Sequence, residues 1–194
     1  NGPRSFAYMG GGGQGCHFES AFGVRLLRGM GSRYHYSALA QELTGHFWAW
    51  GRATGRQYLF GEPDYENTEV LLAVGWNGMM SHQMPQARRF LPRFAKDPSK
   101  VLVVIDPRKS ETAAIADIHL PIRPGTDALL TRAMIALILE KGWEDKAYLK
   151  EHVNGFDGIR YLFEGFDVGA ALKVCGLGYG DVEEVCRQIA SRPS

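Results

Sequence analysis

Short polar side chains follow an apolar segment of the sequence, where they could bind a phosphorylated ligand. Gly75, Asn77 and Ser81 come directly after the run EVLLAV (69–74). Asn and Ser supply compact hydrogen-bonding groups, and glycine leaves the backbone open to a phosphate or a ribose. The alternative is a loop whose Asn and Ser bond only to their own backbone. His82 alone indicates no more than a structural histidine.

A second polar pair follows the run VLVVI (101–105), the strongest strand candidate in the chain. Asp106 can accept hydrogen bonds from a ribose or a base, as acidic residues at strand ends do in dinucleotide-binding folds. Arg108 can face a phosphate or the surface. The alternative for Asp106 is a turn-forming residue with no ligand.

A third candidate is Asp127, in the turn Pro-Gly-Thr-Asp (124–127) that follows the apolar run 118–122. A carboxylate matches the two N–H groups on the edge of guanine in bidentate fashion. The alternative is that Asp127 only caps the helix that begins here, as Thr126 also could.

A fourth loop, Gly10 to Gly15, reads GGGGQG and lies between a short apolar run and a helical segment. Glycines before a helix let backbone N–H groups approach an anion. The loop lacks the Lys of a triphosphate-binding loop, and it matches the pattern GxGxxG only weakly, because consecutive glycines fit many registers. An anion site and a tight packing turn are equally compatible with it.

These loops belong to elements that alternate along the chain, since continuous apolar runs are followed by segments of helical periodicity. The pattern predicts an α/β fold of three layers, in which a mostly parallel sheet has helices on both faces. In such sheets ligands bind beyond the carboxyl ends of the strands, where the four loops would lie. The expected strands are 5–9, 69–74, 101–105 and 118–122, and the expected helices are 17–30, 83–94, 111–116, 127–140, 145–152, 158–164 and 181–190.

Composition limits the classes of protein. The chain has 194 residues, 45% of them apolar, and a formal charge of +1. We expect residues 1–194 to form a single α/β domain, cut from a longer chain at both ends. The balanced charge argues against a nucleic-acid partner, and no apolar run is long enough to span a membrane. The three cysteines, Cys16, Cys175 and Cys186, lack metal-site spacing and are expected to be buried thiols.

The stretch from Asp106 to His152 resembles the molybdopterin oxidoreductases of the dimethyl-sulfoxide-reductase and formate-dehydrogenase type. Their pattern has Asp-Pro-Arg, Thr-Ala, Ala-Asp, Pro-Gly-Thr-Asp, a helix with Ala-Met, and a His before Gly-Phe. Here it is matched, in order and spacing, by residues 106–108, 112–113, 116–117, 124–127, 133–134, 152 and 155–156. The loop with Gly75 and Asn77 is similar to the family's G-x-N-x-x-x-S-H segment.

The resemblance implies a cofactor. Proteins of this family carry two molybdopterin guanine dinucleotides around one molybdenum or tungsten ion. The resembled domain would bind the guanosine-diphosphate end of one of them. By resemblance, Gly75, Asn77 and Ser81 would contact diphosphate and ribose, Asp106 and Arg108 would meet ribose or phosphate, and Asp127 would meet guanine. The expected partners are the remaining domains of the parent chain and an electron-transfer subunit or iron–sulfur protein, and the fragment alone should be inactive.

The family usually places a metal-binding Cys, selenocysteine, Ser or Asp opposite residues 40–45 of this chain. No Cys stands there. Alignment backwards from Gly55 puts Glu42 nearest that position, and a carboxylate is a plausible hard ligand for an oxidised metal. Gln41 and Thr44 remain open, as does the reading of Glu42 as an ordinary helical residue.

Two other classes compete with this interpretation. A cofactor-free structural relative in a respiratory complex would share the fold, although its loops should then have lost their polar residues. A nicotinamide-dependent dehydrogenase would need a clear GxGxxG followed about 20 residues later by an acidic strand end, and here the next strand end is at Gly75. The dehydrogenase is the weakest alternative.

Overall fold

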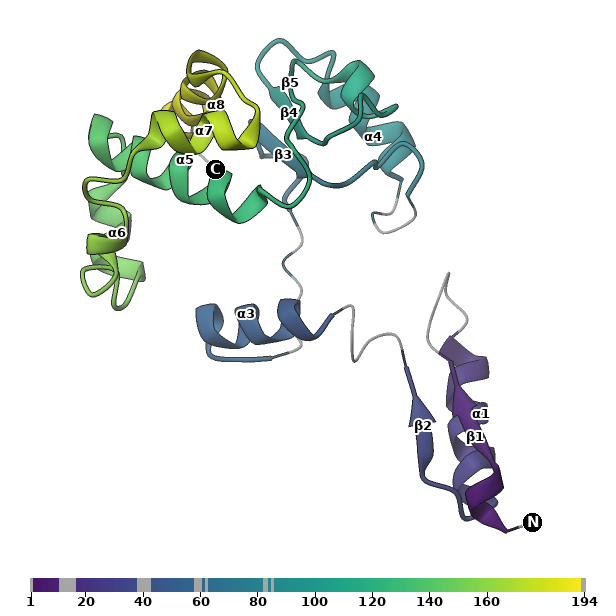
Figure 1. Cartoon of the computed structure of the whole chain (residues 1–194). Coiled ribbons are helices and arrows are strands. Elements are labelled where there is room, and N and C mark those ends of the chain that lie inside the picture. Colours follow the sequence, from purple (N-terminus) through teal and green to yellow (C-terminus); the bar gives the residue numbers. More distant parts are fainter. Residues whose placement is uncertain are drawn as a thin grey trace. The chain divides into compact units, whose positions relative to one another are not determined.

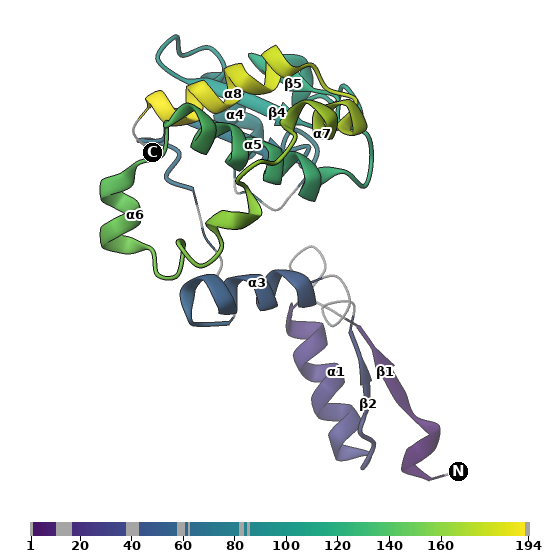
Figure 2. The ribbon, with the colours of Figure 1, turned by 60° about the vertical axis from the view of Figure 1, so that its left-hand side comes forward.

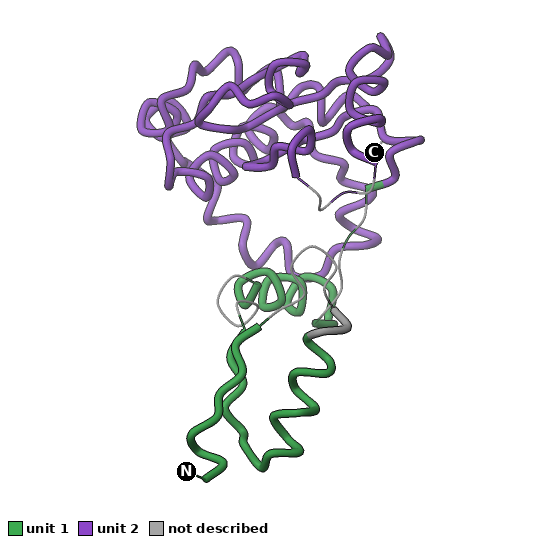
Figure 3. The backbone as a smooth tube through the Cα atoms, turned by 90° about the vertical axis from the view of Figure 1, so that its right-hand side faces the viewer, with its two compact units in different colours: residues 1–63 green, residues 64–194 purple. Residues whose placement is uncertain are grey.

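The structure is a computed structural model that describes residues 2–10, 17–37, 43–57, 61, 63–81, 84 and 86–192 (Figure 1). The chain divides into two compact units, residues 1–63 and residues 64–194, which Figure 3 distinguishes by colour. The expectation that residues 1–194 form a single domain stays a prediction.

Unit 1 contains a β-α-β arrangement followed by another helix. Strands β1 (Ala7–Met9) and β2 (Tyr34–Tyr36) pair in parallel, and helix α1 (His17–Gly29) lies between them in the sequence. Helix α3 (Thr44–Thr54) follows, and a 3₁₀ turn, η1 (Pro3–Ser5), precedes β1. A Cβ built on Gly23 of α1 would lie 2.4 Å from the ring of Tyr8, so this helix approaches β1 closely only because residue 23 is glycine.

Two predictions for unit 1 are confirmed, whereas β2 and α3 were not among the expected elements. The helix predicted for 17–30 is α1, and Gly31 follows it with a left-handed φ of 72°, as expected of a glycine beyond a helix end. The strand predicted for 5–9 is β1, which begins only at Ala7, because Ser5 belongs to the 3₁₀ turn η1. Strand β2 was not predicted, because three residues of sequence Tyr-His-Tyr contain no apolar run.

Unit 2 is built on a three-stranded parallel sheet of order β3-β4-β5. The strands are β3 (Val70–Val74), β4 (Val101–Ile105) and β5 (Ile118–Leu120). The central strand β4 is buried along its whole length, which explains its uninterrupted β-branched and aliphatic sequence. The strand predicted for 118–122 ends earlier, at Leu120, since Pro121 has no N–H with which to continue the ladder.

Side chains of β4 alternate between two hydrophobic clusters, one on each face of the sheet. Val101, Val103 and Ile105 pack with helices of one layer, whereas Leu102 and Val104 pack with helix α4 on the other. The first layer consists of α5 (Asp127–Lys141), α7 (Val168–Cys175) and α8 (Tyr179–Ser191), and the second contains α4 (Ala87–Phe94) (Figures 1 and 2). The predicted α/β class, with a parallel sheet and helices on both faces, is confirmed.

The remaining elements differ from prediction mainly in length. Helix α4 begins at Ala87 rather than Gln83, because Gln86 has a left-handed φ of 59° that no helix continues through. The segments predicted as helices at 111–116 and 158–164 contain only the 3₁₀ turns η3 (Ala113–Ile115) and η4 (Arg160–Leu162), and helix α6 (Lys146–His152) agrees with prediction. Helix α7 was not predicted.

Two of the three cysteines are described, and both are free thiols buried in the core of unit 2, as expected. Burial raises the pKa of Cys186 to about 11, so this thiol stays protonated and unreactive at neutral pH. Cys16 lies outside the described residues.

Within the described residues, no helix has both the length and the apolar content needed to cross a membrane.

Candidate functional site

The carboxyl ends of β3 and β4 bring two of the predicted loops into direct contact. Gly75 follows β3 and donates its N–H to the carbonyl of Ile105, the last residue of β4, at 2.8 Å. Its φ of 60° is in the left-handed region, which explains why glycine stands at this turn. The two loops therefore leave the same edge of the sheet side by side, as the ligand-site rule for parallel sheets predicted.

Asn77 ties the first loop to the second. Its Oδ1 accepts hydrogen bonds from the hydroxyl of Thr112 at 2.7 Å and from the backbone N–H of Thr112 at 3.3 Å. Its Nδ2 donates to Oε2 of Glu111 at 2.6 Å. Ser81 lies one turn further on, with its N–H bonded to the carbonyl of Asn77 at 2.8 Å. The alternative in which Asn77 bonds only to its own loop is therefore wrong.

Two charged side chains, Arg108 and Glu111, lie at the exposed side of the contact between Asn77 and Thr112. Arg108 lies 3.5 Å from Oε2 of Glu111, the same oxygen that accepts from Asn77. The Glu111 backbone N–H, followed by the Asn77 amide, holds the pKa of the Glu111 carboxyl below its usual value. This carboxylate thus occupies a position where two donors converge on an anionic oxygen.

One carboxylate oxygen of Asp106 stabilises the turn after β4, and the other has no partner among the described residues. Its Oδ1 accepts the N–H of Arg108 at 2.8 Å, which is the turn-forming bond that sequence reasoning set as the alternative. Its backbone carbonyl is bonded to Nε2 of His119 at 2.9 Å. Among the described residues, Oδ2 has no hydrogen-bond partner, so one carboxylate oxygen remains available to a ligand.

Asp127 is the first residue of α5 and lines an apolar cavity of about 320 Å³. Apolar side chains of β3, β4 and α5 form the walls, among them Val74, Ile105 and Leu130. Within the described residues, the Asp127 carboxylate makes no hydrogen bond or ion pair. Thr126 occupies the N-cap position, but its hydroxyl donates to the carbonyl of Arg123 at 2.7 Å and caps no N–H of the helix. The expectation that the Asp127 side chain is only a cap is therefore not met.

Sequence reasoning missed the buried hydroxyls beneath the site. Thr112 entered only as part of the family pattern, and Ser110 was not singled out. Thr112 is fully buried, and its Oγ1 accepts the N–H of Met79 at 3.0 Å. The Ser110 hydroxyl, also buried, accepts the N–H of Ala113 at 3.2 Å. A Ser and a Thr spaced two apart, directly after a strand-ending Asp-Pro-Arg, are the features that could have drawn attention to this layer.

The predicted metal ligand cannot be placed. Glu42 and Gln41 lie outside the described residues, as do His82 and most of the loop Gly10–Gly15. Thr44, the other open candidate, is the first residue of α3. Among the side chains that the structure does describe, no group of three or more His, Cys, Asp or Glu could hold a metal ion. The assignment of Glu42 stays a prediction.

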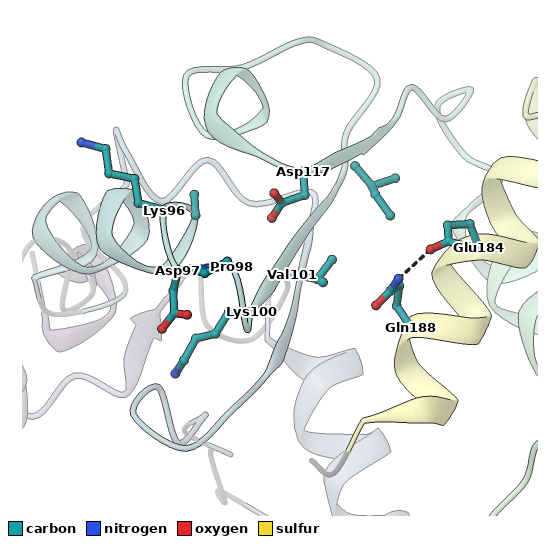
Figure 4. Close-up of a pocket in the computed structure, with 10 residues that line it drawn as sticks. Lys96, Asp97, Pro98, Lys100, Val101, Asp117, Glu184 and Gln188 are labelled. Carbon is teal, nitrogen blue, oxygen red and sulfur yellow. Dashed lines mark hydrogen bonds between the residues drawn. The ribbon is translucent and has the colours of Figure 1, made fainter.

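A second cleft, of about 400 Å³, lies at the opposite, amino-terminal end of β4 (Figure 4). Its polar side chains other than Lys96 are already paired within the protein. Asp117 accepts the N–H of Leu102 at 2.8 Å, Glu184 accepts from Gln188 at 2.6 Å, and Lys100 donates to the carbonyl of Glu66 at 2.7 Å. Because these polar groups have internal partners, this cleft is the weaker ligand site.

Comparison with known families identifies the family of this chain. A family model described as molybdopterin oxidoreductase matches residues 1–186, nearly the whole chain. The chain belongs to the molybdopterin oxidoreductase family. The resemblance that the segment 106–152 indicated is thereby confirmed.

Two curated members illustrate the relationship. The chain is 31% identical over 189 residues to an assimilatory nitrate reductase of Haloferax mediterranei, a match that covers 94% of this chain and 25% of that protein. It is 35% identical over 114 residues to a formate dehydrogenase subunit alpha of Methanocaldococcus jannaschii, covering 59% of this chain and 16% of that protein. The chain therefore spans a quarter or less of the length of these molybdopterin oxidoreductases.

A solved structure supports the fold. Acetylene hydratase from Pelobacter acetylenicus superposes with a TM-score of 0.65 at 23% sequence identity, over 84% of this chain and 22% of that one. At this identity the match concerns the fold alone, and it agrees with the α/β architecture of the family.

Proposed function

We propose that unit 2 binds the guanosine-diphosphate end of a molybdopterin guanine dinucleotide. The observation that carries the proposal is the Asp127 carboxylate, which has no partner among the described residues and lines an apolar cavity together with Val74 and Ile105, the last residues of β3 and β4. Apolar walls suit the faces of a flat base. Guanine presents two adjacent donors, N1–H and the 2-amino group, and a carboxylate offers two acceptors at matching spacing.

The loops after β3 and β4 supply groups for the rest of the nucleotide. Arg108 and the Asn77 amide both contact Oε2 of Glu111 in this structure. The oxygens of a diphosphate are also anionic acceptors, so the same two groups could bind them. Ser81 stands on the same loop as Asn77. The free Oδ2 of Asp106 can accept a ribose hydroxyl. These residues fit the nucleotide end of the cofactor in charge and in donor–acceptor type.

The parent protein is then a molybdenum or tungsten oxidoreductase, whose metal-bound pterin supplies two-electron redox chemistry when bound. The residues of this chain hold and orient the nucleotide end of that cofactor. Glu42 is the proposed protein ligand to the metal, and the proposed partners are further domains of the parent chain and an electron-transfer subunit or iron–sulfur protein. The fragment alone is expected to be inactive.

Binding of guanosine diphosphate (GDP) to the chain tests the proposal directly. Isothermal titration should show binding of GDP at micromolar to millimolar concentration. Adenosine diphosphate should bind at least about tenfold more weakly, because adenine offers one donor and one acceptor where guanine offers two donors. Failure to bind either nucleotide at millimolar concentration would contradict the proposal and favour a cofactor-free structural relative. Equal binding of both would contradict the role of Asp127.

Replacing Glu111 by Gln should strengthen GDP binding about threefold at low salt, since it removes a negative charge beside the proposed diphosphate site. The Gln side chain keeps an acceptor for the Asn77 amide. Because the pKa of Glu111 is below its usual value, the charge and therefore the difference should persist at pH 5. Titrations at low and high salt would measure the effect, which should shrink as salt screens the charge.

Glu151→Gln is the matched control, because Glu151 is an exposed glutamate on α6, outside the proposed site. It should leave the affinity for GDP unchanged. An unchanged or weaker affinity of Glu111→Gln would show that the ligand phosphates do not approach this carboxylate.

A further inference from the structure

Three groups fix the orientation of the Asn77 side chain, and one of them is a buried hydroxyl. Thr112 has no exposed surface, and its Oγ1 accepts the N–H of Met79 at 3.0 Å. A hydroxyl carries one hydrogen. That hydrogen is directed at Oδ1 of Asn77, which lies 2.7 Å away. The three groups form a chain in which Met79 donates to Thr112 and Thr112 donates to Asn77, and such chains strengthen each bond by polarisation.

The reversed orientation of the Asn77 amide is excluded by the donors around it. The backbone N–H of Thr112 also points at Oδ1, at 3.3 Å, and a backbone N–H can only donate. If the amide were rotated by half a turn, its NH₂ group would face this N–H, and the carbonyl oxygen would face the Glu111 carboxylate. Both contacts would be repulsive. Thr112 therefore holds Oδ1 inward and the NH₂ group outward.

The outward NH₂ group has two hydrogens, and one of them serves Oε2 of Glu111 at 2.6 Å. The other remains for a ligand on the side where Arg108 and Glu111 gather. An amide held by buried partners loses little freedom when it binds, which is how a supporting layer of hydrogen bonds raises affinity.

We propose that Thr112 is a positioning residue, which acts through Asn77 to present the amide donors to the diphosphate of the bound nucleotide. The inference rests on the proposed function, because it assumes that an anionic group binds beside Asn77. It adds a residue that touches no ligand and whose side chain acts through its hydroxyl.

A set of variants of the whole chain, titrated with GDP, tests this role. Thr112→Val should weaken binding about tenfold, the loss expected for one hydrogen-bonded contact, whereas Thr112→Ser should stay within about twofold of the unchanged chain. Asn77→Ala should lower the affinity for GDP about tenfold. The double variant Asn77→Ala, Thr112→Val should bind GDP no more weakly than Asn77→Ala alone. Ser110→Ala is the matched control, since it removes a buried hydroxyl of the same loop that bonds to Ala113 and not to Asn77.

Asn77→Asp combined with Glu111→Gln keeps the acceptor oxygens that face Thr112, and the amide introduced at position 111 can donate to the new outward oxygen, so two carboxylates do not face one another. This double variant should keep the melting temperature of Glu111→Gln and lose GDP affinity relative to it, which tests the outward donor even if Thr112→Val does not fold. Equal losses for Ser110→Ala and Thr112→Val, or additive losses in the double variant, would show a general loosening of the loop and overturn the inference.

A measurement without ligand separates this inference from the proposed function. In a ¹H–¹⁵N spectrum of the free chain, the Asn77 side-chain NH₂ should give two well-separated resonances, as in a held amide. Thr112→Val should bring them towards random-coil positions, and Thr112→Ser should not. If the chain binds no GDP, the proposed function fails while this spectrum still decides whether Thr112 holds Asn77. Identical spectra for all three chains would overturn the positioning role itself.

Discussion

Replacing Asp127 by Ala is expected to weaken the binding of GDP about a hundredfold, because two hydrogen bonds to an ionised carboxylate are lost from a largely apolar cavity. Asp127→Asn should be nearly as damaging, since an amide offers one acceptor and one donor to a base edge that has two donors. Isothermal titration of the chain measures both effects.

The ligand offers a second readout of the same contact. Inosine diphosphate lacks the 2-amino group of guanine, so the unchanged chain should bind it about tenfold more weakly than GDP. Asp127→Ala should bind the two nucleotides equally, because the group that distinguishes them is gone. A loss of affinity without a loss of discrimination would place guanine elsewhere.

Asp181→Ala controls for the effect of a carboxylate in the first turn of a helix. Asp181 lies in the first turn of α8, as Asp127 lies in that of α5, and it lines none of the cavities described above. Each replacement should lower the stability of its helix by up to about 1 kcal/mol through the helix dipole. Only Asp127→Ala should change nucleotide binding.

Replacing Leu137 by Ala is expected to lower the free energy of unfolding of unit 2 by about 3 kcal/mol. Leu137 has no exposed surface and packs in the cluster that joins α5, α7 and α8 to the sheet. Truncation removes buried methyl groups and leaves a cavity that the surrounding side chains fill only partly. Urea unfolding followed by circular dichroism measures the change.

The matched control is Leu162→Ala in η4, whose side chain is 40% exposed. It should cost less than about 1 kcal/mol, as surface substitutions do. If both replacements lowered the free energy of unfolding equally, Leu137 of α5 would not be packed in the core against the sheet.

Strands β3 and β4 and the position of the loops that follow them could be predicted from sequence, because both follow from local patterns. The runs 69–74 and 101–105 are continuous and apolar, and strands of that kind lie in a parallel sheet with both faces covered. Parallel strands place their carboxyl ends at one edge, which is why the loops after Val74 and Ile105 could be expected to meet. The structure joins them through Gly75 and Asn77.

The elements that the sequence did not predict are short or have no periodic pattern of apolar residues. Strand β2 has three residues, two of them Tyr. Helix α7 has eight residues and an internal glycine, although its ends are marked. The side chain of Asp167 caps it by accepting the N–H of Ala170 at 2.8 Å, and Gly176 follows it with a φ of 75°. A search for an Asp and a Gly bracketing an apolar octamer would have found this helix.

The contact between Asn77 and Thr112 could not be predicted from spacing. The two residues are 35 positions apart, and their meeting depends on the register of β3 with β4 and on the path of each loop beyond its strand. For Asp127, sequence alone could not separate a cap from a ligand group, because both roles need a carboxylate at a helix start. The structure adds two facts, which are the apolar surroundings of Asp127 and the place of Thr126 at the N-cap position.

The central claim is that this chain holds the guanine nucleotide of a molybdopterin cofactor. The most direct test is to isolate the native protein that contains this sequence, denature it, cleave the released cofactor at its diphosphate, and quantify the products and the metal by mass spectrometry. Guanosine monophosphate and pterin are expected in equal amounts, together with molybdenum or tungsten. Metal and pterin without a guanine nucleotide would contradict the proposed site, and the absence of all three would contradict the cofactor altogether.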